Sequence, residues 1–251
     1  MLVQRKKYMN INRPSIPMRS KPHKSSCLET ECLFGEEVKV IKKKSNWYFC
    51  ELLIDGYKGW VEKRYLSKMK PLTHRVIVTR TFLYINKNIK SNIYHHIPLG
   101  GHISVKTIDK EWAEVYMFQD SPFEYLYIPS KDIININDKI KDWVSIAEQL
   151  IGTPYLWGGR NSLGLDCSAL LQLSYQAYGE KIPRNTIDQI LLKKKIINNL
   201  KFLDRGFVIF WEGHVAIMID KIKCIHANAH HMKVSVEPLI DILSRMGGDN
   251  S

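Results

Sequence analysis

Residues 33–66 alternate apolar and polar positions in short runs, and turn residues interrupt the runs. The runs at 38–41, 47–53 and 59–61 are rich in β-branched and aromatic side chains, which favours strands. Lys44-Ser45-Asn46 and Asp55-Gly56 separate them and are typical of tight turns. Strands this short, joined by tight turns, predict a small β-barrel rather than a helical unit.

The same order of features returns after Pro71. A strand-like run is followed by a polar stretch, by Leu99-Gly100-Gly101 and by a further strand-like run. Trp112 takes the place that Trp47 has in the first set of strands. This degenerate repeat predicts a second barrel.

A different period begins near residue 139. Apolar side chains at i, i+3, i+4 and i+7 predict a helix over 139–151, which Asn137 or Asp138 can cap. A second helix is expected from about Cys167 to Tyr178, and Gly179, the next residue, would end it. Helices followed by an antiparallel sheet make an α+β domain. Strand-like runs follow at 206–211, 214–219, 222–226 and 232–236.

These patterns predict four parts of the chain. They are a basic N-terminal tail (1–14), a first barrel (15–70), a second barrel (71–135) and an α+β domain (136–251).

The 251-residue chain has a formal net charge of +12, and most of the excess lies near its start. Residues 1–70 hold 16 Lys and Arg against 7 Asp and Glu. A nucleic-acid surface is one interpretation of this excess. We favour a solvated lysine-rich face, because the basic residues form no stripe along a helix. No nucleic-acid partner is therefore expected.

The sequence also bears on where in the cell the protein is found. No apolar run approaches the ~18 residues of a membrane helix. The basic start has no apolar stretch of the kind found in signal peptides. The five cysteines include no CxxC pair, which argues against a disulfide framework or a zinc ribbon. We therefore expect a cytoplasmic protein without a metal or other cofactor, and the sequence leaves the oligomeric state open.

Cys167 carries the first chemical signal. A glycine-rich loop, 152–166, delivers it to the predicted first turn of a helix. Free backbone N–H groups and the helix dipole favour thiolate over thiol at this position. The same N–H groups can bind the oxyanion that forms when a thiolate attacks a carbonyl. The alternative is a small buried core residue, as most lone cysteines are.

Two histidines supply the second signal. A thiol nucleophile needs an imidazole that takes and returns a proton, and a third group that orients this imidazole. His214 and His226 begin and end two consecutive predicted strands. In a hairpin they lie directly opposite each other only if an odd-numbered loop is centred on Asp220. A two-residue turn at Asp220-Lys221 would put them on opposite faces. The mechanism therefore predicts the odd loop. The neighbouring His230 and His231 suggest metal, but no cysteine or carboxylate lies at ligand spacing among them.

The chain resembles the NlpC/p60 cysteine peptidases preceded by bacterial SH3-like domains, and the resemblance covers nearly all of it past about residue 15. The peptidase signature is a Tyr-x-Trp-Gly-Gly loop, Asp-Cys-Ser at a helix start, Gly-His-Val and a polar third residue. The matching residues are Tyr155, Trp157, Gly158, Gly159, Asp166, Cys167, Ser168, Gly213, His214, Val215 and His226. The SH3-like pattern matches Gly35, Glu36, Val38, Val40, Trp47, Asp55, Gly56, Tyr57, Gly59, Trp60 and Val61.

The resemblance implies an α+β, papain-like peptidase domain behind two small SH3-like β-barrels. It also implies hydrolysis of peptidoglycan peptides at the bond from γ-D-Glu to a diamino acid, in peptides with a free N-terminal L-Ala. Cys167 would attack, His214 would carry the proton, His226 would orient His214, and the Cys167 N–H with the Tyr155 hydroxyl would stabilise the oxyanion.

The resemblance further implies a set of substrate-binding residues. Asp166 would bind the free ammonium, with Ser168 beside it and Trp157 nearby in the loop. An acid and an aromatic residue from the first barrel would help, and Glu29 or Glu31 with Tyr57 or Tyr65 are the candidates.

Two other functions fit the same residues. The chain could be a catalytically inert cell-wall peptide binding protein, although folding alone does not require Cys167, His214 and His226 together. It could also be a thiol acyltransferase, because the same thiol and imidazole can pass an acyl group to an amine instead of water.

Overall fold

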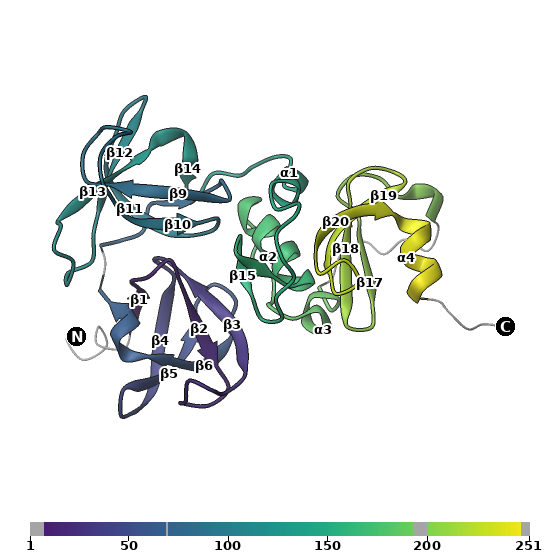
Figure 1. Cartoon of the computed structure of the whole chain (residues 1–251), viewed down its shortest axis with the longest axis horizontal. Coiled ribbons are helices and arrows are strands. Elements are labelled where there is room, and N and C mark those ends of the chain that lie inside the picture. Colours follow the sequence, from purple (N-terminus) through teal and green to yellow (C-terminus); the bar gives the residue numbers. More distant parts are fainter. Residues whose placement is uncertain (1–7, 69, 193–199, 247–251) are drawn as a thin grey trace. The chain divides into compact units, whose positions relative to one another are not determined.

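The computed structural model describes residues 8–68, 70–192 and 200–246, and it divides into two units (Figure 1). The first unit holds residues 1–139 together with 158–162. The second holds residues 140–157 and 163–251. Each unit has a hydrophobic core of its own.

The first seven strands form one antiparallel sheet in the order β3-β2-β6-β5-β4-β1-β7. Their bounds are β1 Tyr8–Ile11, β2 Ser15–Arg19, β3 Leu28–Leu33, β4 Glu37–Lys44, β5 Trp47–Leu52, β6 Lys58–Glu62 and β7 Leu66–Ser67, with a short 3-10 helix at Lys63–Tyr65. The predicted turns are present, since Ser45 and Gly56 both have positive φ. Cys32 and Cys50 lie in the core of this barrel as free thiols.

The predicted basic tail of residues 1–14 needs correction. β1 pairs with β4 and with β7, so Tyr8–Ile11 is part of the first sheet. Its last residue, Ile11, is fully buried in the barrel core, and this burial stabilises the added strand. The Arg5–Lys7 cluster lies outside the described residues.

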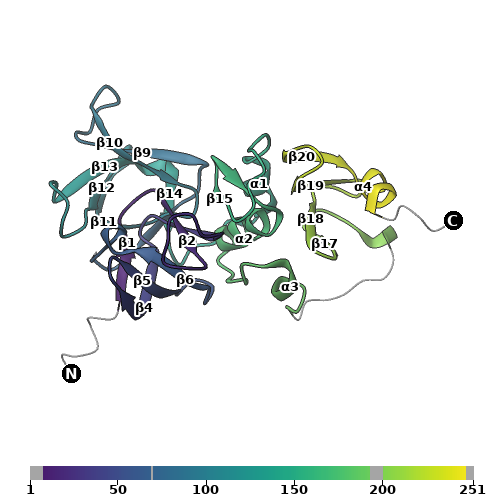
Figure 2. The ribbon, with the colours of Figure 1, turned by 60° about the horizontal axis from the view of Figure 1, so that its bottom comes forward.

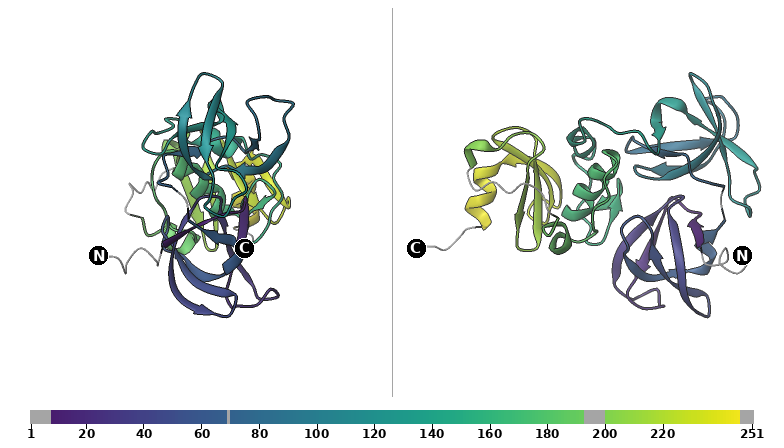
Figure 3. Two further views of the ribbon diagram at one scale, coloured as in Figure 1. Left: turned by 90° about the vertical axis from the view of Figure 1, so that its left-hand side faces the viewer. Right: turned by 180° about the vertical axis from the view of Figure 1, so that it is seen from behind.

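The second set of seven strands repeats the first. Its order, β10-β9-β13-β12-β11-β8-β14, is that of the first sheet with every strand moved seven places along the chain. Trp112 begins β12 as Trp47 begins β5, as the sequence repeat predicts. Figure 3 shows the two groups of strands. The bounds are β8 His74–Val76, β9 Arg80–Tyr84, β10 Ile93–Pro98, β11 His102–Ile108, β12 Trp112–Tyr116, β13 Tyr125–Pro129 and β14 Ile133–Asn135, with a 3-10 helix at Ser130–Asp132.

The second unit combines helices with a four-stranded antiparallel sheet, β17-β18-β19-β20, in agreement with the predicted α+β class. α2 contacts β18 and β19, and α4 contacts β20 (Figures 1 and 2). The bounds are α1 Val144–Glu148, β16 Gly164–Leu165, α2 Cys167–Ala177, α3 Thr186–Gln189, a 3-10 helix at Leu200–Phe202, β17 Val208–Trp211, β18 His214–Met218, β19 Lys223–Asn228, β20 Lys233–Pro238 and α4 Leu239–Met246.

The second predicted helix is confirmed, and the first is shorter than predicted. α2 ends at Ala177, and Gly179 follows with a positive φ, which is the usual conformation after a helix. The helix predicted over 139–151 is formed only at Val144–Glu148, and neither Asn137 nor Asp138 caps it. Asp142 stands before its first turn, where its carboxylate accepts hydrogen bonds from the Val144 and Ser145 N–H groups and pairs with Arg205 at 2.8 Å. An acceptor in this position begins a helix rather than continuing one.

A short segment of the glycine-rich loop is bound within the first unit. β15 (Arg160–Asn161) places the Arg160 guanidinium in the interior, where its Nη1 lies 2.7 Å from Glu36 Oε1 and 2.9 Å from Oε2. The side chains are 0% and 1% exposed. The Glu31 carboxylate accepts hydrogen bonds from the Arg160 backbone N–H at 2.8 Å and from Asn161 Nδ2 at 2.7 Å. Two carboxylates of the first barrel therefore hold residues 160 and 161.

We expect Glu36→Gln to lower the free energy of unfolding by about 3 kcal/mol, because the buried Arg160 guanidinium loses its counter-charge. Urea unfolding followed by circular dichroism measures the change. Lys106→Met is the matched control, since it breaks the exposed Lys106–Glu114 pair and should change stability little. Equal, small changes for both variants would contradict this role of the Arg160–Glu36 pair.

Candidate functional site

Cys167 is the first residue of α2, as the sequence predicts. Asp166 caps this helix, because its Oδ1 accepts a hydrogen bond from the Ala169 N–H at 2.9 Å. The thiol is 6% exposed, and its Sγ lies 4.0 Å from the Gly213 carbonyl oxygen. A backbone hydrogen bond links it to Val215 as well. The sulfur therefore lies beside the residues that flank His214 in the chain.

The resting thiol is neutral, which corrects the expectation of a thiolate at the helix terminus. Burial and, to a smaller extent, the nearby Asp166 carboxylate raise the pKa of Cys167 to about 11. The backbone N–H groups of Val215 and Ser168 act in the opposite direction but do not outweigh burial. In the resting site the effect of desolvation thus exceeds the effect of the helix N-terminus.

His214 and His226 lie on one face of the sheet and contact each other. Their ring atoms Nε2 of His214 and Nδ1 of His226 are 2.8 Å apart. The loop between the two strands has an odd number of residues, as predicted. Its centre is Lys221 rather than Asp220, because Ile217 faces Ile225 and Met218 faces Cys224. The two histidines are therefore diagonal neighbours rather than directly opposite residues. Diagonal side chains on one face of a sheet can still touch when they are aromatic.

Glu237 on β20 continues this line of contacts. Its Oε1 lies 2.7 Å from His226 Nε2. The register of β19 and β20 pairs His226 with Ser235, so Glu237 is again a diagonal neighbour on the same face. Burial would raise the pKa of Glu237, but hydrogen bonds from Arg245 and His226 outweigh it and lower the pKa to about 2. Glu237 is consequently a carboxylate at neutral pH.

The imidazole of His214 is neutral at neutral pH. Burial and, to a smaller extent, the neighbouring His226 lower its pKa to about 4, and Glu237 acts in the opposite direction. A neutral imidazole can accept a proton, and the thiol lies against the residues on either side of His214 in the chain.

Tyr155 interacts electrostatically with Cys167 and Asp166. Burial raises its pKa to about 12, together with the charge that Cys167 and Asp166 carry when ionised. The interaction with Cys167 shows that the phenol lies near the sulfur. The hydroxyl therefore stays protonated at neutral pH and can donate a hydrogen bond.

The charge of Asp166 is balanced within the site. Arg184 Nη2 lies 2.7 Å from Asp166 Oδ2, and Nη1 lies 2.9 Å from Oδ1. Ser168 Oγ donates to Asp166 Oδ1 at 3.0 Å and accepts from Arg184 Nη1 at 2.8 Å. The structure thus brings Asp166 and Ser168 together beside Cys167, but an arginine that the sequence analysis missed already neutralises the carboxylate.

The other predicted binding residues lie in different surroundings. Trp157 is 73% exposed. In the first barrel, Tyr57 Oη donates to Glu29 Oε2 at 3.0 Å, so this acid and this aromatic residue form a contact. Glu31 instead binds residues 160 and 161, and burial raises its pKa. Tyr65 packs under the Arg64 guanidinium, 4.6 Å from ring centroid to Cζ.

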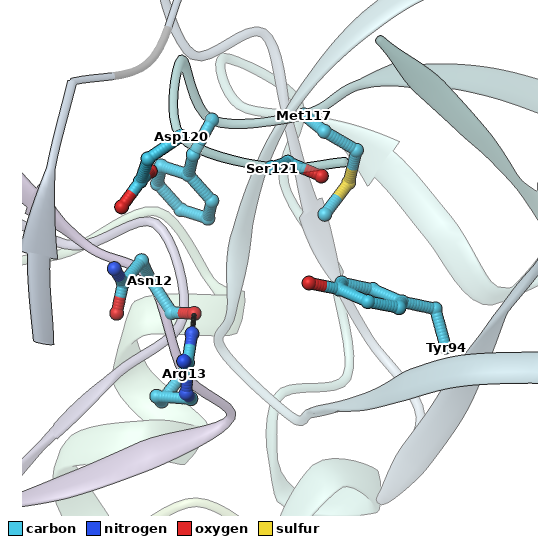
Figure 4. Close-up of a pocket in the computed structure, with 7 residues that line it drawn as sticks. Asn12, Arg13, Tyr94, Met117, Asp120 and Ser121 are labelled. Carbon is cyan, nitrogen blue, oxygen red and sulfur yellow. Dashed lines mark hydrogen bonds between the residues drawn. The ribbon is translucent and has the colours of Figure 1, made fainter. Parts of the chain in front are cut away.

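A small pocket in the first unit contains none of the predicted residues (Figure 4). It is lined by Asn12, Arg13, Tyr94, Met117, Phe118, Asp120 and Ser121. Neither cysteine nor histidine occurs among these side chains. Arg13 donates to the Asn12 carbonyl oxygen at 2.9 Å, and Asp120 accepts from Ser67. This pocket therefore lacks the thiol and the imidazole that the predicted chemistry requires.

Within the part of the chain that the structure describes, no three His, Cys, Asp or Glu side chains gather in a way that could hold a metal ion. Among the same residues, no helix has the length and apolarity needed to cross a membrane.

Two family models match the chain. The NlpC/P60 family model matches residues 152–242, and the bacterial dipeptidyl-peptidase Sh3 domain model matches residues 18–66. The first contains Cys167, His214, His226 and Glu237, and the second contains Glu29 and Glu36.

Curated relatives and a solved structure are similar over most of the chain. The gamma-D-glutamyl-L-lysine dipeptidyl-peptidase of Bacillus subtilis is 28% identical and is aligned over 80% of this chain and 72% of its own length. A Bacillus cereus protein of the same name is 26% identical, over 84% of this chain and 71% of its own. The crystal structure of an NlpC/P60 family protein from Bacillus cereus has a TM-score of 0.78 at 20% identity, covering 92% and 94% of the two chains. These similarities confirm the predicted fold class.

Because Cys167 is a neutral thiol at rest, we expect its alkylation by iodoacetamide to keep accelerating between about pH 7 and pH 10, as the thiolate fraction rises. Peptide mapping by mass spectrometry separates Cys167 from the exposed Cys27. A rate that stops rising below about pH 7 would instead indicate a preformed thiolate–imidazolium pair.

Proposed function

The chain is a cysteine-type hydrolase with an NlpC/P60 domain behind a bacterial dipeptidyl-peptidase SH3 domain, and from this premise we propose that it cleaves peptidoglycan peptides between γ-D-Glu and the diamino acid. The names of the two Bacillus relatives support this bond, with lysine as the diamino acid in those proteins. The observation that carries the proposal is the contact of His214 with His226 at 2.8 Å, beside a thiol bonded to the Gly213–Val215 segment.

In the proposed reaction, Cys167 loses its proton to His214 as the sulfur attacks the γ-carbonyl carbon of D-Glu. The high pKa of the resting thiol supports transfer during the attack rather than before it. His214 then returns the proton to the departing amine of the diamino acid. Water hydrolyses the thioester in a second step, with His214 again taking and returning a proton.

Oxyanion stabilisation falls to two donors in this proposal. The Cys167 backbone N–H lies in the first turn of α2, where N–H groups have no partner within the helix. The Tyr155 hydroxyl remains protonated because its pKa is about 12. Two such donors aimed at the developing charge are the usual means of stabilising an acyl-transfer transition state.

Substrate recognition is proposed to require a free N-terminal L-Ala. As the carboxylate that would bind the ammonium of this L-Ala, Glu29 with its partner Tyr57 is better suited than Asp166, because Arg184 already balances the charge of Asp166. For Glu31, Tyr65, Ser168 and Trp157 a substrate-binding role stays a prediction from the resemblance.

We propose a reducing compartment such as the cytoplasm as the place of action. The five cysteines are all free in the structure, and the reaction needs Cys167 reduced. Recovery of the chain in the cytoplasmic fraction of its cells would support this location, and recovery outside the cells would contradict it.

Cys167→Ala should lower the cleavage of L-Ala-γ-D-Glu-L-Lys by about 10⁴-fold or more, since the nucleophile is lost. Mass spectrometry of the products measures cleavage, and Cys27→Ala is the matched control with an exposed thiol removed. The same peptide with an acetylated N-terminus should react much more slowly.

Three outcomes would contradict the proposal. Equal cleavage by wild type and Cys167→Ala would show that Cys167 is not the nucleophile. Cleavage by neither would leave a peptide-binding protein. Products whose mass shows the acyl group on an added amine, in place of hydrolysis products, would indicate an acyltransferase.

A further inference from the structure

We propose that Glu237 is a positioning residue that sets the protonation of both imidazoles, so that Nδ1 of His214 is the nitrogen that accepts the thiol proton. The inference rests on the proposed peptidase reaction and adds a fourth residue to it. Two short contacts connect the Glu237 carboxylate to His226 and His226 to His214.

The first step is the contact between Glu237 and His226. Glu237 Oε1 and His226 Nε2 are 2.7 Å apart, and both side chains are buried, at 10% and 2% exposed. An ionised carboxylate can only accept hydrogen bonds, so a proton must lie on His226 Nε2. Asn228 Nδ2, which is 3.1 Å from the same nitrogen, donates to Ser235 Oγ at 2.9 Å. The amide therefore does not need the His226 nitrogen as an acceptor.

The second step follows from the neutral charge of His226. Burial lowers the pKa of this imidazole, so it carries one proton at neutral pH. With that proton on Nε2, the Nδ1 atom of His226 is an acceptor. It lies 2.8 Å from His214 Nε2, which must therefore be the donor.

The third step assigns the reactive nitrogen. A neutral His214 with its proton on Nε2 has a lone pair on Nδ1. When the Cys167 S–H bond breaks, its proton forms a bond to Nδ1 and the electron pair stays on sulfur. The positive charge on His214 is then stabilised through His226 by the Glu237 carboxylate. Glu237 itself takes up no proton, because its pKa is about 2.

Other charged and titratable groups border this line of contacts. Around Glu237, Arg245 Nη2 of α4 lies at 2.6 Å and His231 Nε2 at 3.4 Å, and Cys224 is opposite it in the strand register. Arg245 and His231 both disfavour a charged His226. Glu237 is thus the group in this set that stabilises positive charge on the two imidazoles.

The test is Glu237→Gln, with Glu148→Gln as the matched control. Glu148 also pairs with an arginine, Arg205 at 2.7 Å, but does not belong to the site. We expect Glu237→Gln to lower kcat about 10- to 100-fold at unchanged KM, the loss typical of a partner that orients a functional imidazole. Glu237→Asp should recover part of kcat, because it keeps the charge. Glu148→Gln should match wild type.

A histidine titration by NMR separates positioning from structural damage. Loss of the Glu237 charge should move the His214 pKa below its value of about 4, because the imidazolium loses a stabilising charge. A site opened by misfolding would move it up, toward the value of an exposed histidine. An upward or absent shift would overturn the inference.

This readout needs no substrate. If wild type cleaves no peptide but the His214 pKa falls in Glu237→Gln, the proposed function fails and the assignment of Glu237 stands. If wild type cleaves the peptide and Glu237→Gln does so equally well, the assignment of Glu237 fails alone.

Discussion

Two short hydrogen bonds in a buried sheet join His214, His226 and Glu237, and the chemistry that we propose for the chain depends on them. A buried imidazole without a fixed partner could carry its proton on either nitrogen. A carboxylate that only accepts removes this freedom, first at His226 and then at His214. The strand register of β18, β19 and β20 makes the arrangement possible, because it places the three side chains on one face as diagonal neighbours.

Desolvation has two opposite consequences in this site. It raises the pKa of Cys167 and lowers that of His214, so both groups are neutral before reaction. It also strengthens every electrostatic contact that forms once charge develops, because little water is present to screen it. The Glu237 carboxylate, which two hydrogen bonds connect to His214, can therefore stabilise positive charge on the His214 imidazole. The same physics explains why Arg160 needs Glu36 in the interior of the first unit.

Much of the fold and part of the site could be predicted from the sequence. The turns at Ser45 and Gly56, the helix from Cys167 and the strands around His214 and His226 follow from local patterns. The first strand, Tyr8–Ile11, was not predicted, because it is a strand only through its pairing with β4 and β7, which lie far away in the sequence. Helix α1 is shorter than its periodicity suggests, since the Asp142 carboxylate accepts hydrogen bonds from the Val144 and Ser145 N–H groups and so marks the start of the helix.

The residues missed at the site share one physical cause. Glu237 and Arg184 reach it through strand register and through a loop that returns to the helix start, and no local motif encodes either contact. The prediction that the loop between the two histidines has an odd number of residues was correct, but the centre of the loop lies one residue later than predicted. Local patterns predict which face a side chain takes, whereas the partner across the sheet depends on the register of the whole hairpin.

The tautomers of the two imidazoles are the most direct test of this account. Two-bond ¹H–¹⁵N correlation NMR on ¹⁵N-histidine-labelled protein at neutral pH reports which ring nitrogen carries the proton. We expect a proton on Nε2 and a lone pair on Nδ1 in both His214 and His226. A proton on Nδ1 of either ring, or an imidazolium at neutral pH, would contradict it.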